Sequence, residues 1–294
     1  MSVPKKHLPL RRYRRPIWGR KLQDALVKAF SIFALILAVG TMLWILTTIF
    51  LRGSEALGWG FLTNPSKPYG MPEAGIANAL LGTLMITVGA TAVAVPLAIA
   101  AGIWLAEFGK QGRLAMALRF SANVLMGMPS VIVGLFVYMV LVIPMGGFSG
   151  GAGAVALAIL MFPVVMRTTE DMLAMVPYTL REAGLALGMT RCRVTLSIIC
   201  RAAKNGLVTG VLLSIARVSG ETAPLLFTAL FADTWPTEFF SGPTPNIPVL
   251  ITEYATNSPF ESMHQAGWGA ALVITLLVLS VNLLARTFFR ERKY

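Results

Sequence analysis

The sequence contains very few of the residues that bind metals or form cross-links. Among 294 residues there are only two histidines, His7 and His264, and two cysteines, Cys192 and Cys200. A site for zinc or another transition metal needs several such ligands close together, and a disulfide framework needs more thiols. We therefore expect no metal site, no disulfide framework and no bound cofactor.

Charged residues are also scarce. They make up 13% of the chain, whereas hydrophobic residues make up 56%, which excludes an ordinary soluble domain and indicates an integral membrane protein. No G-x-x-x-x-G-K-[S/T] phosphate-binding loop occurs, because GKQGR, which begins at Gly109, has the wrong spacing. There is no nucleophile–base arrangement either. We predict that the chain is not an enzyme and that any ATP hydrolysis belongs to a partner chain.

Long apolar runs, in contrast, are abundant. A helix that crosses about 30 Å of hydrocarbon needs roughly 20 predominantly apolar residues. We therefore predict an all-α integral membrane protein with six transmembrane helices, over residues 29–51, 78–107, 122–143, 151–166, 205–231 and 268–288. Pro96, Pro129 and Pro163 are expected to interrupt three of these spans.

Basic residues are concentrated in alternate segments between the runs. They occur before the first run, after the second and fourth runs, and at the C-terminus, whereas the other loops are mainly acidic. By the positive-inside rule, both termini are expected in the cytoplasm. The predicted parts are a basic tail at 1–28, a first helix at 29–51, a core at 78–288 with a cytoplasmic loop at 167–204, and a second tail at 289–294. We expect the first tail to face lipid headgroups, with a nucleic-acid-binding arm as the less favoured alternative.

A charged pair interrupts the fifth run. Arg217 and Glu221 lie four residues apart in SIARVSGETAPLLFTAL. Insertion scales assign about 2.5–3.5 kcal/mol to a charged side chain at the centre of a membrane helix, so an interaction must offset this cost. Either the two residues share a helix face as a structural ion pair, or they line a water-accessible pathway in which Arg217 meets an anion. We favour the pathway, because a guanidinium fork matches a tetrahedral oxyanion.

The cytoplasmic loop at 167–204 contains one short amphipathic segment. Pro177 suits the first turn of a helix, apolar residues recur over residues 178–187, and Gly188 supplies a stop signal. A helix of about ten residues is marginal in water by itself, so we expect it to dock on another surface.

This segment resembles a known loop. EAGLALG, followed by Ile198, resembles the EAA loop of ABC-importer permeases. The resemblance implies a type I (MetI-like) permease fold, and a coupling helix that fits a groove of a cytoplasmic ATPase. It implies these coupling residues: Glu182, Ala183, Gly184 and Gly188. Gly184 replaces the third small residue of the pattern, a change that we expect to be mild.

Two further stretches sharpen the resemblance. FPVVMRTTEDML (162–173) and ARVSGETAPLLFTAL (216–230) resemble the A-type permease family of bacterial phosphate-specific ABC importers. The resemblance implies import of inorganic phosphate across the bacterial inner membrane, with Arg167, Arg217 and Glu221 on the phosphate pathway. The implied partners are two ATPase copies, a sister C-type permease that completes a heterodimer, and an extracytoplasmic phosphate-binding protein, besides membrane lipid.

Several alternatives stay open. Arg167, at the end of the fourth run, equally fits a plain positive-inside residue. The loop at 232–267 is either a docking surface for an extracytoplasmic partner or an interfacial segment. The alternative functions are a permease for sulfate, molybdate or phosphonate, and a secondary anion transporter, which would need a proton or sodium site. A membrane scaffold would not need charges inside its spans.

Overall fold

The computed structural model describes residues 17–68, 71, 74–109 and 112–288. The chain divides into two compact units, residues 1–48 and 49–294. The described part of the first unit belongs to helix α1 (Ile17–Ser54), and large apolar side chains of this part, among them Phe30, Ile36 and Trp44, are exposed. The helix begins before the predicted span, so residues 17–28 of the predicted tail are helical. The predicted tail residues 1–16 and 289–294 lie outside the described residues.

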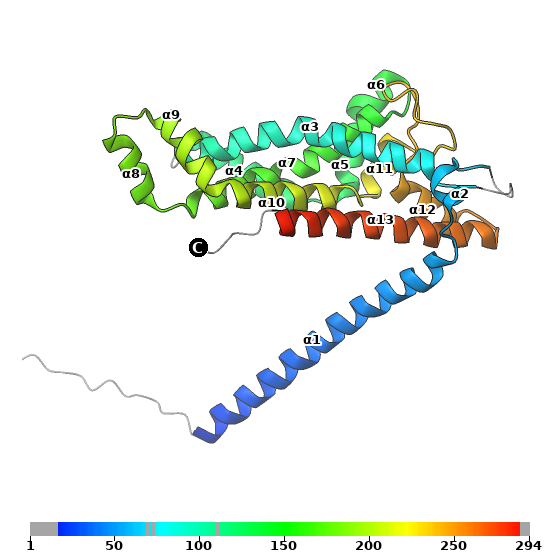
Figure 1. Cartoon of the computed structure of the whole chain (residues 1–294), viewed down its shortest axis with the longest axis horizontal. Helices are drawn as coiled ribbons and strands as arrows, with labels where there is room; N and C mark the ends of the chain where they lie inside the picture. Colours follow the sequence, from blue (N-terminus) through cyan, green and yellow to red (C-terminus); the bar gives the residue numbers. More distant parts are fainter. Residues whose placement is uncertain (1–16, 69–70, 72–73, 110–111, 289–294) are drawn as a thin grey trace, which may run out of the picture. The chain divides into compact units, whose positions relative to one another are not determined.

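The second unit is helical wherever its described residues form regular structure (Figure 1). Its α-helices are α2 (Trp59–Thr63), α3 (Ala77–Glu107), α4 (Arg113–Gly127), α5 (Ser130–Val137), α6 (Ile143–Met145), α7 (Gly150–Ala174), α8 (Tyr178–Ala186), α9 (Arg191–Val194), α10 (Cys200–Val218), α11 (Ala223–Thr228), α12 (Ile247–Thr256) and α13 (Glu261–Phe288). Two π-helical turns, η1 (Tyr138–Val142) and η2 (Thr195–Ile199), join α5 to α6 and α9 to α10. The predicted all-α class is confirmed.

Within the described residues, five helical segments are long and apolar enough to cross a membrane, and a bent pair makes a sixth if it is one span. The five are Lys21–Ser54, Ala77–Glu107, Gly150–Ala174, Arg191–Val218 and Glu261–Leu283. The bent pair starts with α4 near the end of the bundle that carries α8, and finishes with α6 near the opposite end (Figure 1). It therefore passes from one end of the bundle to the other, as the six-span prediction requires.

The third predicted span, 122–143, is two helical segments that meet at 105°. The break falls at Met128 and Pro129, because proline has no N–H to donate and its ring disfavours helical backbone at the preceding residue. The expected interruption by Pro129 is thus confirmed. It was wrong for Pro96 and Pro163, which lie inside α3 and α7 while these helices continue.

The fifth predicted span, 205–231, was also wrong as a single helix. A continuous helical segment runs from Arg191 to Val218, and residues 219–222 are not helical. A new helix, α11, then begins with Pro224 in its first turn, where a missing N–H costs nothing. The apolar run therefore contains a helix end and a helix start.

The core of the bundle is the contact between α3 and α7, the most extensive between any two helices of the described residues. Small buried residues line it: Ala90, Ala94 and Ala98 on α3, and Ala154 and Ala158 on α7. A methyl group on Gly102 of α3 would lie only 2.6 Å from Cβ of Thr169, so these backbones approach closely. The small residues of the two runs predicted this close packing.

Candidate functional site in the centre of the bundle

Helices α7 and α10 run antiparallel, and their register fixes the depth of Arg217. Gly206 of α10 lies against Met172 of α7, and Gly210 lies against Thr168. Continuing this register places Ser214 level with Val164, and Arg217 near the middle of α7. Arg217 therefore lies at mid-level of the bundle, although it is in the last turn of α10.

A cavity of about 110 Å³ lies at the level of Arg217. Its polar lining consists of Ser130, Ser214, Arg217 and Glu221. The remaining lining residues are apolar: Leu125, Met126, Met128, Leu160, Met161, Val164 and Val218. The cavity thus brings together two of the three predicted pathway residues, on walls formed by α4, α5, α7 and the end of α10.

Arg217 and Glu221 form only a loose pair. The Nε atom of Arg217 is 3.9 Å from Oε1 of Glu221, and the arginine side chain is 66% exposed against 22% for the glutamate. Arg217 lies in the last turn of α10, whereas Glu221 lies in the non-helical segment after it. The less favoured alternative, a structural ion pair on one shared helix face, is therefore contradicted, because the helix ends between the two residues.

Two cavity residues, Ser214 and Ser130, were missed by the sequence analysis. Ser214 is 2% exposed, and its Oγ atom makes no hydrogen bond within the described residues. A buried hydroxyl without a partner costs about 1–3 kcal/mol. Ser130 is the first residue of α5, directly after the 105° break. The proline at the break was a visible signal for Ser130, but nothing in the sequence marks Ser214.

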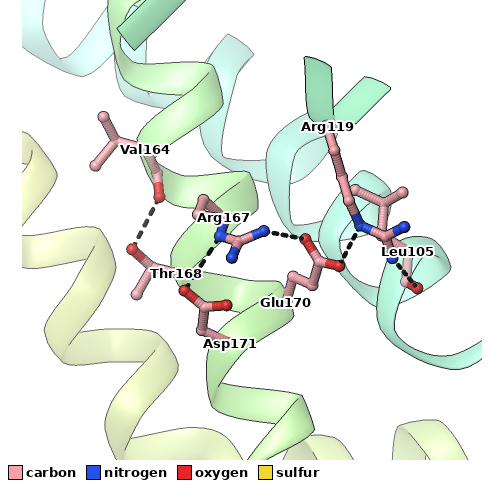
Figure 2. Close-up of polar contacts among 7 residues, drawn as sticks. All are labelled: Leu105, Arg119, Val164, Arg167, Thr168, Glu170 and Asp171. Atoms are coloured by element: carbon pink, nitrogen blue, oxygen red, sulfur yellow. Dashed lines mark hydrogen bonds and ion pairs between the residues drawn. The ribbon is translucent and has the colours of Figure 1, made fainter. Parts of the chain in front are cut away.

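Arg167, the third predicted pathway residue, does not line this cavity. Its Nη1 atom is 3.3 Å from Oε2 of Glu170, and its Nε atom is 3.3 Å from Oδ2 of Asp171, so both acids hold it on α7 (Figure 2). Arg167 lies six residues from the level of Arg217 in the α7–α10 register, about 9 Å along the axis at 1.5 Å per residue. Its place on the phosphate pathway stays a prediction.

The same cluster ties α7 to α4, a connection that the sequence analysis missed. The Nε atom of Arg119 donates a hydrogen bond of 2.7 Å to Oε1 of Glu170, and its Nη2 atom donates to the carbonyl oxygen of Leu105 at 3.3 Å (Figure 2). These charges compensate one another, which explains why α7 continues to Ala174, beyond its predicted end at residue 166.

The short helix predicted at 178–187 is present as α8, and an arginine on its inner side anchors it. Its role in coupling stays a prediction. Arg181 donates to Oε1 of Glu107 at 2.6 Å, and to the carbonyl oxygens of Leu173 at 2.8 Å and Val176 at 2.7 Å. Its side chain is 12% exposed and that of Glu107 is 10% exposed. One guanidinium therefore connects α8 to the ends of α3 and α7. The sequence analysis treated Arg181 only as a basic loop residue.

The four predicted coupling residues divide between the two sides of α8. Glu182 and Ala183 are exposed, whereas Gly184 is buried. A methyl group on Gly184 would lie 2.8 Å from Cγ2 of Val194, so an alanine at this position would force its neighbours to shift. The difference between Gly184 and the family pattern is therefore less mild than expected. Gly188 ends the helical turn with φ at +77°, a conformation that glycine adopts without strain.

The comparisons with known proteins agree with this architecture. Residues 98–293 match the family described as binding-protein-dependent transport system inner membrane component. The phosphate transport system permease protein PstA of Haemophilus influenzae is 43% identical over 276 residues, which cover 94% of this chain and 97% of that protein. The family match and the candidate spans show that the chain is a multi-pass inner-membrane protein. As predicted, it is a membrane component of the transport system and not the subunit that hydrolyses ATP.

Two solved structures share the fold. A bacterial alginate ABC transporter, solved with an alginate-bound periplasmic protein, aligns with a TM-score of 0.66 at 12% identity, covering 94% of this chain and 98% of that one. The inward-facing MetNI methionine ABC transporter aligns with a TM-score of 0.58 at 15% identity, covering 73% and 92%. At these identities they show the fold alone, which is the importer-permease fold predicted. Taken with the relative and the family match, these findings show that the chain belongs to the binding-protein-dependent transport system inner membrane components and, among them, to the phosphate transport system permease family.

Proposed function

We propose that this chain is a permease subunit of an ATP-driven importer of inorganic phosphate, and that Arg217 meets phosphate in the central cavity. The observation that carries the proposal is an arginine midway along the length of the bundle that is only loosely paired. A guanidinium presents a rigid fork of N–H donors that matches the oxygens of a tetrahedral anion. In this proposal Glu221 holds the guanidinium between transport cycles, and phosphate displaces it.

Phosphate is favoured over other oxyanions because the similar protein of Haemophilus influenzae is a phosphate transport permease. Sulfate, molybdate and phosphonate carry oxygens that the same guanidinium would bind, so Arg217 alone does not choose among them. The relative that is 43% identical over nearly the whole chain is a phosphate transport permease. A secondary anion transporter is less favoured, because the family model describes a system that depends on a binding protein.

Transport is proposed to be driven through α8. Its outer face exposes Tyr178, Glu182 and Leu187, the last of these by 81%, whereas Arg181 and Gly184 face the bundle. A helix of nine residues is marginal by itself, and apolar side chains exposed on it favour contact with a partner surface. We assign this face to the groove of a partner ATPase dimer, whose closure on ATP binding would move α8 and, through Arg181, the ends of α3 and α7.

Two further partners complete the proposed importer. Arg217 is 66% exposed on this chain alone, and a charged side chain at this depth would otherwise face lipid. A sister permease that covers this face would remove that cost and complete the pathway. An extracytoplasmic phosphate-binding protein would dock at the opposite end of the bundle from α8, where α12 and the loop before it lie (Figure 1).

The proposed orientation places α8 and both termini in the cytoplasm. It rests on the basic residues of alternate loops. A Ser241→Cys variant in intact cells should react with an impermeant thiol reagent, whereas Cys192, which is exposed, and Cys200 should not. Labelling of the native pair with Ser241→Cys unlabelled would reverse the orientation.

The transport role of Arg217 is tested by Arg217→Gln in the assembled importer. Uptake of radiolabelled inorganic phosphate should be abolished, while insertion into the membrane and association with the ATPase continue. Arg193→Gln is the matched control, because Arg193 is an exposed arginine of α9 and its loss should leave uptake within about twofold of wild type. Wild-type uptake in Arg217→Gln would remove the proposal.

Coupling is tested separately on the outer face of α8. Glu182→Lys reverses an exposed charge, so the protein should fold and insert as before. ATP hydrolysis and phosphate uptake should no longer respond to each other, because the docking face has changed. Unchanged uptake together with unchanged association with the ATPase would mean that α8 is only a linker.

A further inference from the structure

The hydroxyl of Ser214 behaves differently from other buried hydroxyls in the helices. Thr83 and Thr228 each donate to a carbonyl oxygen four residues earlier in their own helix, at 2.7 and 2.8 Å. Such bonds satisfy a hydroxyl without any other partner. Ser214 is equally buried, but its Oγ atom makes no hydrogen bond within the described residues, and the residue lines the central cavity. Its donor is thus unpaired on a residue of the cavity wall.

The amino end of α5 supplies a second feature of the same cavity. The 105° break at Met128 and Pro129 starts a new helix in the middle of the bundle, and Met128 and Ser130 both line the cavity. From Ser130 the chain stays helical through η1 and α6 to Met145. The first amides of a helix have no partners within it and carry a partial positive charge, so a helix start favours anions.

The remaining walls make these donors effective. Apart from Ser130, Ser214, Arg217 and Glu221, the lining is apolar. Donors in such surroundings interact more strongly with an anion than they would in water. A water molecule needs roughly 10–15 Å³ of such space, so about 110 Å³ accommodates a small tetrahedral anion.

We propose that Ser214 is a phosphate-contacting residue, whose hydroxyl donates a hydrogen bond to one oxygen of the anion while the Arg217 guanidinium and the amino end of α5 face the others. This inference rests on the proposed function and adds to it a donor that carries no charge. Ser214 contributes to holding phosphate in the centre of the bundle, whereas Arg217 supplies the charge that admits it.

The test compares Ser214→Ala with a matched control in the assembled importer, reconstituted with its ATPase and saturated with phosphate-loaded binding protein. Loss of one hydrogen bond to a charged group should lower the rate of phosphate uptake, and the phosphate carried per ATP hydrolysed, by about tenfold. Thr228→Val removes another buried hydroxyl, one that donates to the carbonyl oxygen of Pro224 in its own helix, α11. This control should stay within about twofold of wild type.

A purely structural role predicts different readouts. Ser214→Ala removes a buried donor without a partner, so the melting temperature of the complex should stay the same or rise even as uptake falls. Ser214→Thr keeps the hydroxyl and should retain most of the uptake. Reduced uptake with a matching loss of melting temperature, or no recovery in Ser214→Thr, would overturn the contact.

The outcomes separate the two proposals. Wild-type uptake in Ser214→Ala with no uptake in Arg217→Gln would overturn the role of Ser214 and leave the proposed function standing. Wild-type uptake in both variants would remove both. Loss of uptake in both, with normal melting temperatures, supports both.

Discussion

Arg181 and Arg217 each lie beside a glutamate, but the surroundings make one a structural anchor and leave the other available. Arg181 is 2.6 Å from Glu107, mostly buried, and bonded to two carbonyl oxygens as well. Arg217 is 3.9 Å from Glu221, largely exposed, and lies at a helix end. The difference shows that an arginine–glutamate pair in a membrane protein indicates structure or transport according to how many of its donors are already occupied.

The largest expected effect is on the tightly held pair. Arg181→Gln leaves the carboxylate of Glu107 buried without its partner, and breaking such a pair costs about 3–5 kcal/mol. The full chain in detergent should therefore show a marked fall in melting temperature, whereas Arg217→Gln should change it little. Equal stability of the two variants would erase the comparison.

Exchanging the charges sharpens the comparison. Arg217→Glu with Glu221→Arg moves the cation off the end of α10, so uptake should fall roughly 100-fold or more while stability changes by about 0.5 kcal/mol or less. Glu107→Arg with Arg181→Glu should not recover stability. A carboxylate at position 181 cannot donate to the carbonyl oxygens of Leu173 and Val176. Uptake near wild type in the first exchange would make Arg217 and Glu221 a structural pair.

A smaller effect is expected where α8 packs on the bundle beside Arg181. The methyl group of Gly184→Ala would meet Val194 at 2.8 Å and Ile198 at 3.0 Å, and overpacking of this kind costs about 1–3 kcal/mol. The melting temperature should fall, and the stimulation of ATP hydrolysis by loaded binding protein should weaken as α8 shifts. Ala186→Ser, at an exposed position of α8, is the control. An unchanged Gly184→Ala variant would show that Arg181 alone positions α8.

The smallest effect concerns Asp233, whose carboxyl pKa is shifted more by burial than by its charged and polar neighbours. Burial raises the pKa of the Asp233 carboxyl above its ordinary value of 3.8, nearby Glu253 raises it further, and a hydrogen bond with Ser66 opposes the rise. The folded state then binds more protons than the unfolded state above pH 3.8, so stability falls as the pH rises through the raised pKa. Asp233→Asn should therefore melt at a slightly higher temperature than wild type at neutral pH. A difference that persists unchanged on acidification would assign the effect to something other than this charge.

Hydropathy predicted where the helices cross, but not where they break. The runs at 122–143 and 205–231 are predominantly apolar, and hydropathy is much the same on both sides of each bend. Local signals were present in both: Pro129 in the first, and Ser219, Gly220 and Pro224 in the second. Pro129 was used to predict an interruption of the first run, whereas the signals in the second run were outweighed by its length.

The site was predictable in its charges and not in its hydroxyl. Arg217 and Glu221 were recognisable because ionisable groups are costly inside a span. Ser214 could not be chosen, because its role depends on whether its hydroxyl bonds to its own helix, and packing decides this. The pairs Arg119–Glu170 and Glu107–Arg181 join residues 51 and 74 positions apart, which no local pattern reports.

The close contact of α3 with α7 has a mechanical consequence for the whole bundle. Two helices whose backbones approach this closely are expected to move together as one rigid body. Changes of backbone shape are then confined to interruptions such as residues 128–129 and 219–222, which act as pivots. Met128 and Glu221 at these pivots also line the cavity. An anion bound there would therefore contact both pivots, so that anion binding and restriction of the two pivots would occur together.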